Sequence, residues 1–227
     1  MKGLPLNWAE ATAPQKAKVM DQLVDIFLEI ERHPFDSLGS ILQPQHGLPL
    51  DGFAENRMFK VGSGPLGLFR SQTEADRATV NTYLRMIASG EVANVAPVDV
   101  YLVHRFRLDV IQKLEGESAE EEHFFLKHPD DKGDHILVDD SYNITGIVDW
   151  EWTRTERKAY AFSSPCMMWP VAKFYEGSNE LSNSEIIFAD MFKGRGRDDL
   201  AEYLLGGRKV QRFYFNFGGD AQDRATS

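Results

Sequence analysis

The chain contains one cysteine among its 227 residues, and this scarcity excludes an intramolecular disulfide. Because Cys166 has no partner thiol, we expect a reducing, cytoplasmic location. No apolar run is long enough to cross a bilayer, so no membrane association is expected. The first eight residues also lack the apolar core of a signal peptide.

Basic residues are also scarce, since 25 Lys and Arg stand against 35 Asp and Glu and give a formal net charge of -10. This excess of negative charge argues against nucleic acid as a partner, because phosphate groups would be repelled. It weakly favours neutral or cationic small molecules. The hydrophobic content of 42% predicts a globular protein with a sizeable core.

Apolar residues at helical spacing predict a mostly helical α+β fold. A helix is expected to begin at Thr12, with Pro14 in its first turn and Gln15 at the position that completes a capping box. Pro34 is expected to end this run. Further helices are expected at residues 71–90, 101–114, 184–192 and 197–205.

Two of these helices carry more specific signals. Ser71, with Glu74 three residues later, gives a second capping-box pattern. The inward residues of this helix are expected to be Val80, Tyr83, Leu84 and Ile87. The inward residues of the helix at 101–114 are expected to be Val103, Phe106, Val110 and Leu114.

Short strands are expected at 123–127, 136–138 and 144–148, and the turn at 139–143 joins the last two as a hairpin. The segment from Trp152 to the helix at residue 184 is expected to be irregular.

The hairpin is flanked by acidic residues that suit phosphoryl transfer. His128-x-Asp130 precedes its first strand, and Asp149 follows its second strand, 19 residues after Asp130. Because a hairpin brings these two segments together, both acids can face one cleft. Asp130 could then orient or accept the proton of a hydroxyl, and Asp149 could bind magnesium through oxygen. The alternative is that both are turn-forming residues beside a surface hairpin.

Three further features allow more than one interpretation. Lys132 could contact a transferred phosphate, or it could be a solvated loop lysine. The histidines and acids of residues 128–135 are also compatible with a metal-dependent hydrolase, although no helical H-x-x-x-H pair is present. The segment Gly62–Gly67 spells G-x-G-x-x-G, but Pro65 and the late helix start at Ser71 favour a turn over a phosphate loop.

The motif residues resemble the aminoglycoside phosphotransferase and choline kinase branch of the protein-kinase-like fold. That branch carries H-G-D-x-x-x-x-N, an apolar strand, and then I-D-W or V-D-W, which residues 128–135 and 148–150 resemble. Fungal members of the phosphotransferase family are more similar still, with H-x-D-D-K-G-D-H-I-L-V-D followed by N-I-T-G-I-I-D-W. The resemblance runs to about Gly219, so we expect a domain at 1–219 and a disordered tail at 220–227.

The resemblance implies ATP and Mg²⁺ as cofactors and a small-molecule hydroxyl as the acceptor. It assigns Asp130 as the catalytic aspartate, with His128 bracing its loop, and Lys132 stays a candidate phosphate contact. Asp149 is assigned to magnesium and thereby to the nucleotide. His135 stands where the family has a metal-binding asparagine, so His135 or Asp134 is expected to complete the metal shell.

The residues Met1–Leu6 resemble the hinge that joins the two lobes of the family, so we expect the C-terminal lobe alone with a small catalytic β-hairpin. A truncated gene model, an internal start or a true half-kinase would each give this result. Phosphoryl transfer is expected to be impaired without a nucleotide lid. The alternative function is a non-catalytic pseudokinase or half-kinase module, which could self-associate through the apolar surface that normally faces the N-terminal lobe.

Overall fold

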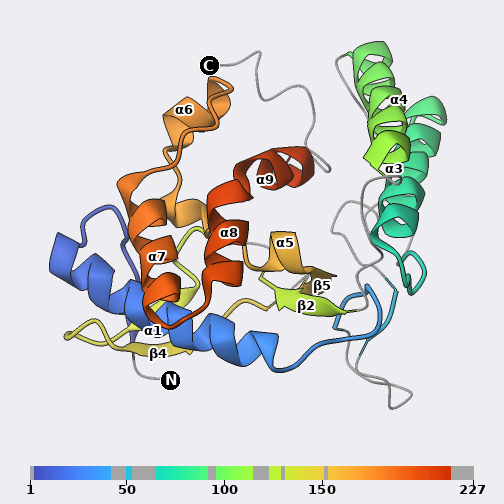
Figure 1. Cartoon of the computed structure of the whole chain (residues 1–227). Helices are drawn as coiled ribbons and strands as arrows, with labels where there is room; N and C mark the ends of the chain where they lie inside the picture. Colours follow the sequence, from blue (N-terminus) through green and yellow to red (C-terminus); the bar gives the residue numbers. More distant parts are fainter. Residues whose placement is uncertain are drawn as a thin grey trace. The chain divides into compact units, whose positions relative to one another are not determined.

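The computed structural model describes residues 3–41, 50–52, 65–91, 96–114, 123–128, 131–150 and 153–215. These residues form eight α-helices and two small antiparallel sheets (Figure 1), which confirms the predicted mostly helical α+β class. None of the helices within these ranges combines the length and hydropathy needed to cross a membrane. Residues 62–64 of the Gly62–Gly67 segment and the predicted tail lie outside the described residues.

The chain divides into two compact units, which we describe separately. The first unit consists of Met1–Pro34, Phe125–Thr153 and Lys158–Gln211. The second unit consists of Phe35–Phe124, Arg154–Arg157 and Arg212–Ser227. The predicted hairpin and the loop before it therefore belong to the first unit.

Helix α1 of the first unit spans Ala13–Glu31 and confirms the first predicted helix. The Thr12 N–H donates to Gln15 Oε1 at 2.7 Å, which is the reciprocal bond of a capping box. The residues that line the buried face of α1 are Val19, Met20, Leu23 and Val24. Their three- and four-residue spacing places them on one side of the helix, as expected.

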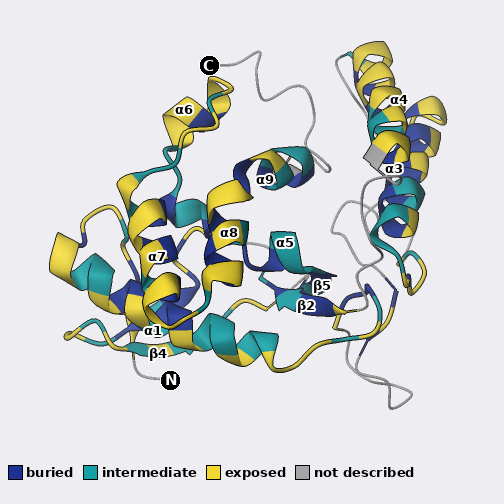
Figure 2. Ribbon diagram, viewed as in Figure 1, coloured by how far each residue is buried: buried dark blue, intermediate teal, exposed yellow. Residues whose placement is uncertain are grey.

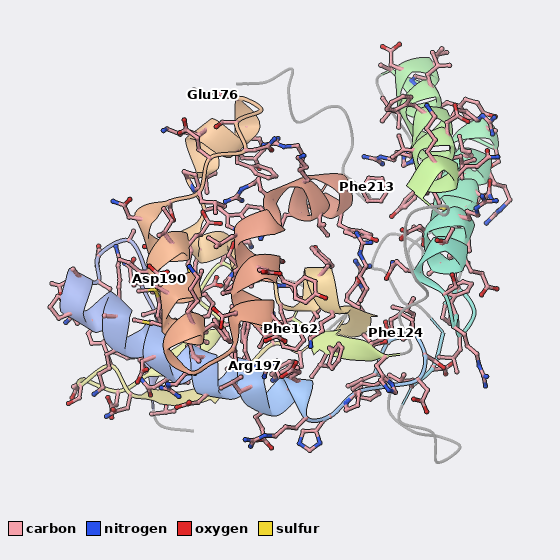
Figure 3. The ribbon with its side chains drawn as sticks, viewed as in Figure 1. Phe124, Phe162, Glu176, Asp190, Arg197 and Phe213 are labelled. Carbon is pink, nitrogen blue, oxygen red and sulfur yellow. The ribbon has the colours of Figure 1, made fainter. Side chains whose placement is uncertain are left out.

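Helix α1 packs beside α7 (Asn183–Gly194), and α7 packs beside α8 (Asp198–Gly206), as Figure 1 shows. The faces that these helices turn toward one another are buried (Figure 2). Phe27 of α1 makes edge-to-face contacts with Phe162 and Phe188, at centroid distances of 6.0 and 5.7 Å. Phe162, labelled in Figure 3, is almost fully buried. The core of the first unit thus combines aliphatic side chains with aromatic ones, which bury a large apolar area each.

A three-stranded antiparallel sheet of order β1-β3-β4 packs into the same core. Its strands are β1 (Leu4–Pro5), β3 (Ile136–Val138) and β4 (Ile144–Ile147). Ile136 lies opposite Ile147 across the β3–β4 pair. The predicted hairpin is therefore confirmed, with its second strand ending one residue earlier than expected.

The segment after Trp152 is more regular than predicted. The elements that it contains are β5 (Arg154–Arg157), α5 (Lys158–Ala161), the 3₁₀ turn η1 (Cys166–Met168) and α6 (Val171–Tyr175). The remaining strand, β2 (Phe124–Lys127), matches the predicted strand before the motif. Elements of three to five residues are shorter than the window over which hydrophobic periodicity can be recognised, so the prediction of an irregular segment was wrong.

Sequence analysis also missed α9, which spans Arg208–Phe215. Its buried side chains at the first turn are polar, because Arg208 pairs with Glu185 at 2.5 Å and lies 4.8 Å from the centre of the Trp169 ring. One turn later, the Gln211 side chain donates to the Ser164 carbonyl at 2.9 Å. A helix that buries charged and amide groups does not show the apolar period used to predict helices.

In the second unit, α3 (Gln72–Ala88) and α4 (Pro97–Leu114) pack against each other. The predicted inward residues of α3 are buried, namely Val80, Tyr83, Leu84 and Ile87. The predicted capping box at Ser71 and Glu74 was wrong, because the Ser71 side chain makes no capping hydrogen bond to the helix.

Two of the predicted inward residues of α4, Val103 and Phe106, were also wrong, whereas Val110 is partly buried and the side chain of Leu114 lies outside the described part of the structure. Val103 and Phe106 are 47% and 67% exposed, while the buried positions are Val100, His104 and Ile111. The His104 ring stacks on Tyr83 of α3 with a centroid distance of 5.2 Å. Apolar residues occur around most of α4, so their spacing alone does not determine which side faces α3.

Candidate functional site

The hairpin turn is built by one aspartate. The Asp139 carboxylate accepts hydrogen bonds from the backbone N–H groups of Ser141 and Asn143, at 2.9 and 2.8 Å, and from the Asn143 amide at 2.7 Å. Tyr142, between these residues, has a positive φ of 59°. Such local side-chain bonds are why Asp and Asn favour turns, and they set the register in which β4 returns along β3.

At the other end of the hairpin, Val148 joins the end of β4 to the histidine-containing loop. Its N–H donates to the His135 carbonyl at 2.9 Å, and its carbonyl is 3.0 Å from His128 Nε2. A carbonyl oxygen can only accept, so this bond requires the proton of the His128 ring to be on Nε2. The two imidazole rings stack with a centroid distance of 4.2 Å. Both ends of the loop that contains residue 130 are therefore connected to the end of β4.

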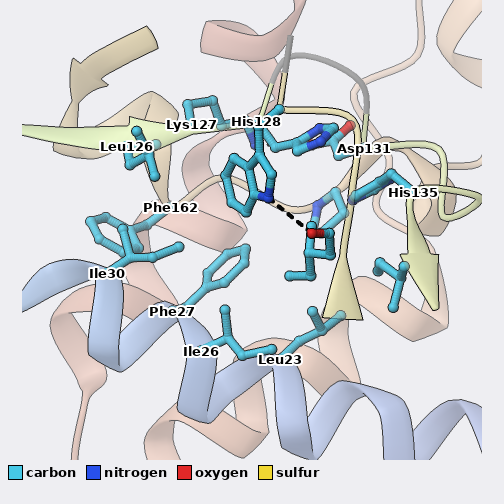
Figure 4. A pocket seen from close by; sticks show the side chains of 15 residues that line it. Leu23, Ile26, Phe27, Ile30, Leu126, Lys127, His128, Asp131, His135 and Phe162 are labelled. Carbon is cyan, nitrogen blue, oxygen red and sulfur yellow. Dashed lines mark hydrogen bonds and ion pairs between the residues drawn. The ribbon is translucent and has the colours of Figure 1, made fainter. Parts of the chain in front are cut away.

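Asp149 directly follows this connection. It is exposed, and its φ of 63° places a non-glycine residue in the left-handed region, which is uncommon and often marks a functional position. The next residue, Trp150, donates its indole N–H to the Ile147 carbonyl at 2.9 Å (dashed line in Figure 4). Its ring contacts His128 edge to face at 5.1 Å. These contacts fix the backbone on the far side of Asp149.

A buried ion pair spans the other side of the loop. Lys127 Nζ lies 2.9 Å from Asp131 Oδ2, and the two side chains are 10% and 16% exposed. Asp131 Oδ1 accepts from the Cys166 N–H at 2.9 Å. Burial alone would raise the pKa of Asp131, but the Lys127 ammonium and the Cys166 amide outweigh it and hold the pKa below its ordinary value. Asp131 is therefore an ionised carboxylate with both oxygens occupied, which makes it a poor general base.

A cavity of about 50 Å³ lies between this loop and α1. Figure 4 shows Leu23, Ile26 and Phe27 of α1 on one side, with Lys127 and Asp131 on the opposite side. Ligand pockets for drug-sized molecules occupy roughly 300–1,000 Å³. This cavity is too small for a nucleotide and is better explained as a packing space behind the loop.

A second, open groove lies on the other side of the loop. Lys132 and Asp134 line it together with Met167 and residues 5–9, and its volume is about 460 Å³. Gly133 between them has a φ of 109°, and a Cβ there would lie 3.0 Å from the Met167 sulfur. Successive residues of the loop therefore face different sides, because Lys132 and Asp134 line the groove while Asp131 and His135 line the cavity.

This arrangement places two of the residues predicted to bind metal, Asp134 and His135, on different sides of the loop. Asp149 and Asp134 are exposed carboxylates, which are suitable ligands for Mg²⁺. His135 is buried and stacked on His128, and imidazole nitrogen suits Mg²⁺ poorly, so its surroundings favour a packing role. Within the described part of the chain, no three His, Cys, Asp or Glu side chains form a metal cluster.

Asp130 lies outside the described residues, together with Pro129 and Glu151. The expectation that the Asp130 and Asp149 carboxylates face one cleft therefore stays a prediction. What sequence reasoning missed at this site is the Lys127–Asp131 pair. Its only signal was a lysine four residues before an aspartate across the H-x-D motif.

No family model matches the chain, and no curated protein matches its sequence. The family resemblance thus depends on the motif residues themselves.

Proposed function

We propose that this chain is the C-terminal lobe of a kinase-like phosphotransferase, which transfers the γ-phosphate of ATP to a hydroxyl group of a small molecule. The observation that carries the proposal is the double connection at Val148, to His128 Nε2 and to the His135 carbonyl. These bonds hold His128, the first residue of the H-x-D motif, beside the strand end that is followed by Asp149. Phosphoryl transfer depends mainly on such positioning and on electrostatic stabilisation.

Within this proposal, the acceptor oxygen bonds to the γ-phosphorus as the bond to ADP breaks, and the proton of the hydroxyl passes to Asp130. His128 acts through its bond to Val148 and keeps the loop in place. Asp149, with Asp134 as the second candidate, would hold a magnesium ion, which neutralises phosphate charge when bound. Lys132, on the groove side of the loop, is the candidate cation for the transferred phosphate.

The groove beside Lys132 and Asp134 supports an acceptor site on that face. Its volume of about 460 Å³ falls within the range of small-molecule pockets. It offers one carboxylate, one ammonium and the Trp8 side chain, which suits a polar molecule that carries hydroxyl groups.

The test is Mg²⁺-dependent ATP binding by purified protein, measured by calorimetry, with Asp149→Asn as the variant. Removing a carboxylate ligand is expected to weaken Mg-ATP binding by about tenfold or more. Asp139→Asn is the matched control, because Asp139 holds the turn at the opposite end of the hairpin. Equal affinity in wild type and Asp149→Asn, or no Mg-ATP binding at all, would contradict the proposal.

A non-catalytic binding module is the second candidate function. It is favoured by a stripe of exposed apolar side chains on α4, formed by Val98, Leu102 and Phe106. These residues are spaced by four and therefore share one face of the helix. Contiguous apolar surface of this kind is typical of interaction sites. The metal-dependent hydrolase has no comparable support among the described residues.

A further inference from the structure

Asp131 connects the loop that follows the H-P-D motif to two other segments of the chain. Its carboxylate binds Lys127 Nζ at 2.9 Å and the Cys166 N–H at 2.9 Å, and its carbonyl accepts from the Met167 N–H at 3.1 Å. The Lys127 ammonium in turn lies 5.6 Å from the centre of the Tyr160 ring. Three chain segments thus meet at one carboxylate: β2, the motif loop and η1.

The ion pair is a costly way to stabilise this position. Burying two charges removes them from water, and well-packed apolar residues often stabilise a fold as well or better. Lys127 and Asp131 nevertheless line a cavity whose other walls are mainly apolar side chains, some of which belong to α1 (Figure 4). A pair that adds little to stability but has a defined geometry is suited to positioning a backbone.

The position of the ion pair in the sequence shows which segment of the backbone it would position. Lys127 ends β2 and Asp131 begins the described part of the next loop, so the pair closes a segment with only residues 128–130 between its members. His128, the first of these, is independently bound to Val148. The segment that contains Asp130 is thus anchored at its beginning and at its end.

We propose that Asp131 is a positioning residue for phosphoryl transfer, held by Lys127 and the Cys166 amide so that the chain is anchored directly after residues 129 and 130. This inference rests on the proposed function. It assigns no proton transfer to Asp131, because both of its oxygens are occupied. Misplacement of a reacting group by about 1 Å can cost roughly a hundredfold in rate, so loss of the anchor should reduce kcat far more than nucleotide binding.

The experiment compares Asp131→Asn, Lys127→Met and the double variant with wild type. Asp131→Asn keeps the shape of the side chain but removes the ion pair, and the double variant leaves no buried charge unpaired. We expect the kcat for transfer of the γ-phosphate of ATP to fall by about a hundredfold in Asp131→Asn. The Kd for Mg-ATP should change by less than about twofold. The double variant should regain the melting temperature of wild type without regaining kcat.

A purely structural pair would behave differently. The double variant would then recover kcat together with its melting temperature, and this result would overturn the inference. Asp139→Asn serves as the control, since it removes a turn aspartate from the same hairpin and should change stability without changing kcat.

A readout that needs no nucleotide separates this inference from the proposed function. The His128 Nε2–H signal and the exchange rates of the Cys166 and Met167 amides can be followed by NMR in wild type and Asp131→Asn. Altered signals in a protein that does not bind Mg-ATP would refute the phosphotransferase function while supporting the anchor. Unchanged signals in a protein that binds Mg-ATP would refute the anchor alone.

Discussion

Asp76 of α3 is a buried carboxyl group whose hydrogen-bond partners are both neutral. Gln72 donates to its Oδ1 at 2.9 Å, and the Tyr214 hydroxyl donates to its Oδ2 at 3.0 Å. Burial raises the pKa of Asp76 from 3.8 to about 7, and the nearby Glu156 carboxylate adds to this effect. The hydrogen bonds from Gln72 and Tyr214 and the charge of Arg157 only partly oppose it.

This pKa predicts a characteristic dependence of stability on pH. Between pH 4 and 7 the unfolded chain has lost the Asp76 proton while the folded protein keeps it, so stability falls as the pH rises through this range. The loss from this group is on the order of 4 kcal/mol, an upper limit that follows from about three pKa units. Asp76→Asn removes the titration, so urea unfolding of the variant should show a flatter profile and higher stability than wild type at pH 8.

The dependence of stability on pH is the decisive readout, because an asparagine at position 76 can keep hydrogen bonds to both Gln72 and Tyr214. Tyr214 can donate to its oxygen, and its NH₂ can donate to Gln72 Oε1, which is buried and has no hydrogen-bond partner among the described residues. Parallel profiles for wild type and Asp76→Asn would show that Asp76 does not titrate in this range.

At the scale of residues, the sequence identified the motif but not its surroundings. The H-x-D pattern and Asp149 could be recognised because the chemistry predicted for them requires a few residue types in a fixed order. The stacking of His135 on His128 could not be recognised in the sequence. It depends on a loop in which His135 lines the cavity and Asp134 lines the groove. Side-chain direction in a loop with a positive-φ glycine follows from backbone geometry that composition does not reveal.

At the scale of elements, the end of α1 is tied to the start of α8 by Arg197. Its guanidinium bonds to Glu31, the last residue of α1, and to Asp199 Oδ2 at 2.7 Å. Lys158 adds a second cation at 2.5 Å from Glu31 Oε1. The hydrogen bond from Arg197 lowers the pKa of Glu31, against the raising effect of burial. This network connects two helices that the aromatic core already brings together.

Arg197→Met is therefore expected to reduce the free energy of unfolding by about 1–2 kcal/mol at pH 7. A carboxylate with a lowered folded pKa stabilises the fold above its unfolded value of 4.5 and loses this effect as the pH falls through the folded value. The difference between variant and wild type should thus shrink below pH 4.5. Lys193→Met, which breaks an exposed pair with Asp190, is the control and should change stability by less than about 0.5 kcal/mol. An effect of Arg197→Met that is constant from pH 7 to pH 3 would contradict this account.

Elements could be predicted where a single physical signal dominated. Helix α1 has a cap and one apolar face, and the hairpin has a turn aspartate between two β-branched runs, so both were predicted nearly to the residue. The buried side of α4 and the whole of α9 could not be predicted, because α4 has apolar residues on more than one side and α9 buries Arg208 and Gln211. In both cases tertiary contacts determine which side chains are buried, and the local periodicity of the sequence does not predict these contacts.

At the scale of the whole molecule, a net charge of -10 opposes close approach of two copies, while exposed apolar side chains favour it. The α4 stripe of Val98, Leu102 and Phe106 is the clearest apolar surface on a described helix. Salt screens repulsion between the acidic copies but does not weaken apolar contacts. Self-association through this stripe should therefore strengthen as the salt concentration rises, whereas association through ion pairs should weaken.

Sedimentation velocity over a range of protein concentrations and at 50 and about 500 mM salt tests this expectation. Wild type should form a reversible oligomer that is more populated at high salt, and Leu102→Glu should be monomeric because it places a charge within the stripe. Gln112→Glu is the matched control, since it adds the same charge at an exposed position of α4 outside the stripe and should still associate. Wild type that stays monomeric at every concentration and salt level would remove the support for a self-associating module. The same result in Leu102→Glu and Gln112→Glu would place the contact on another surface.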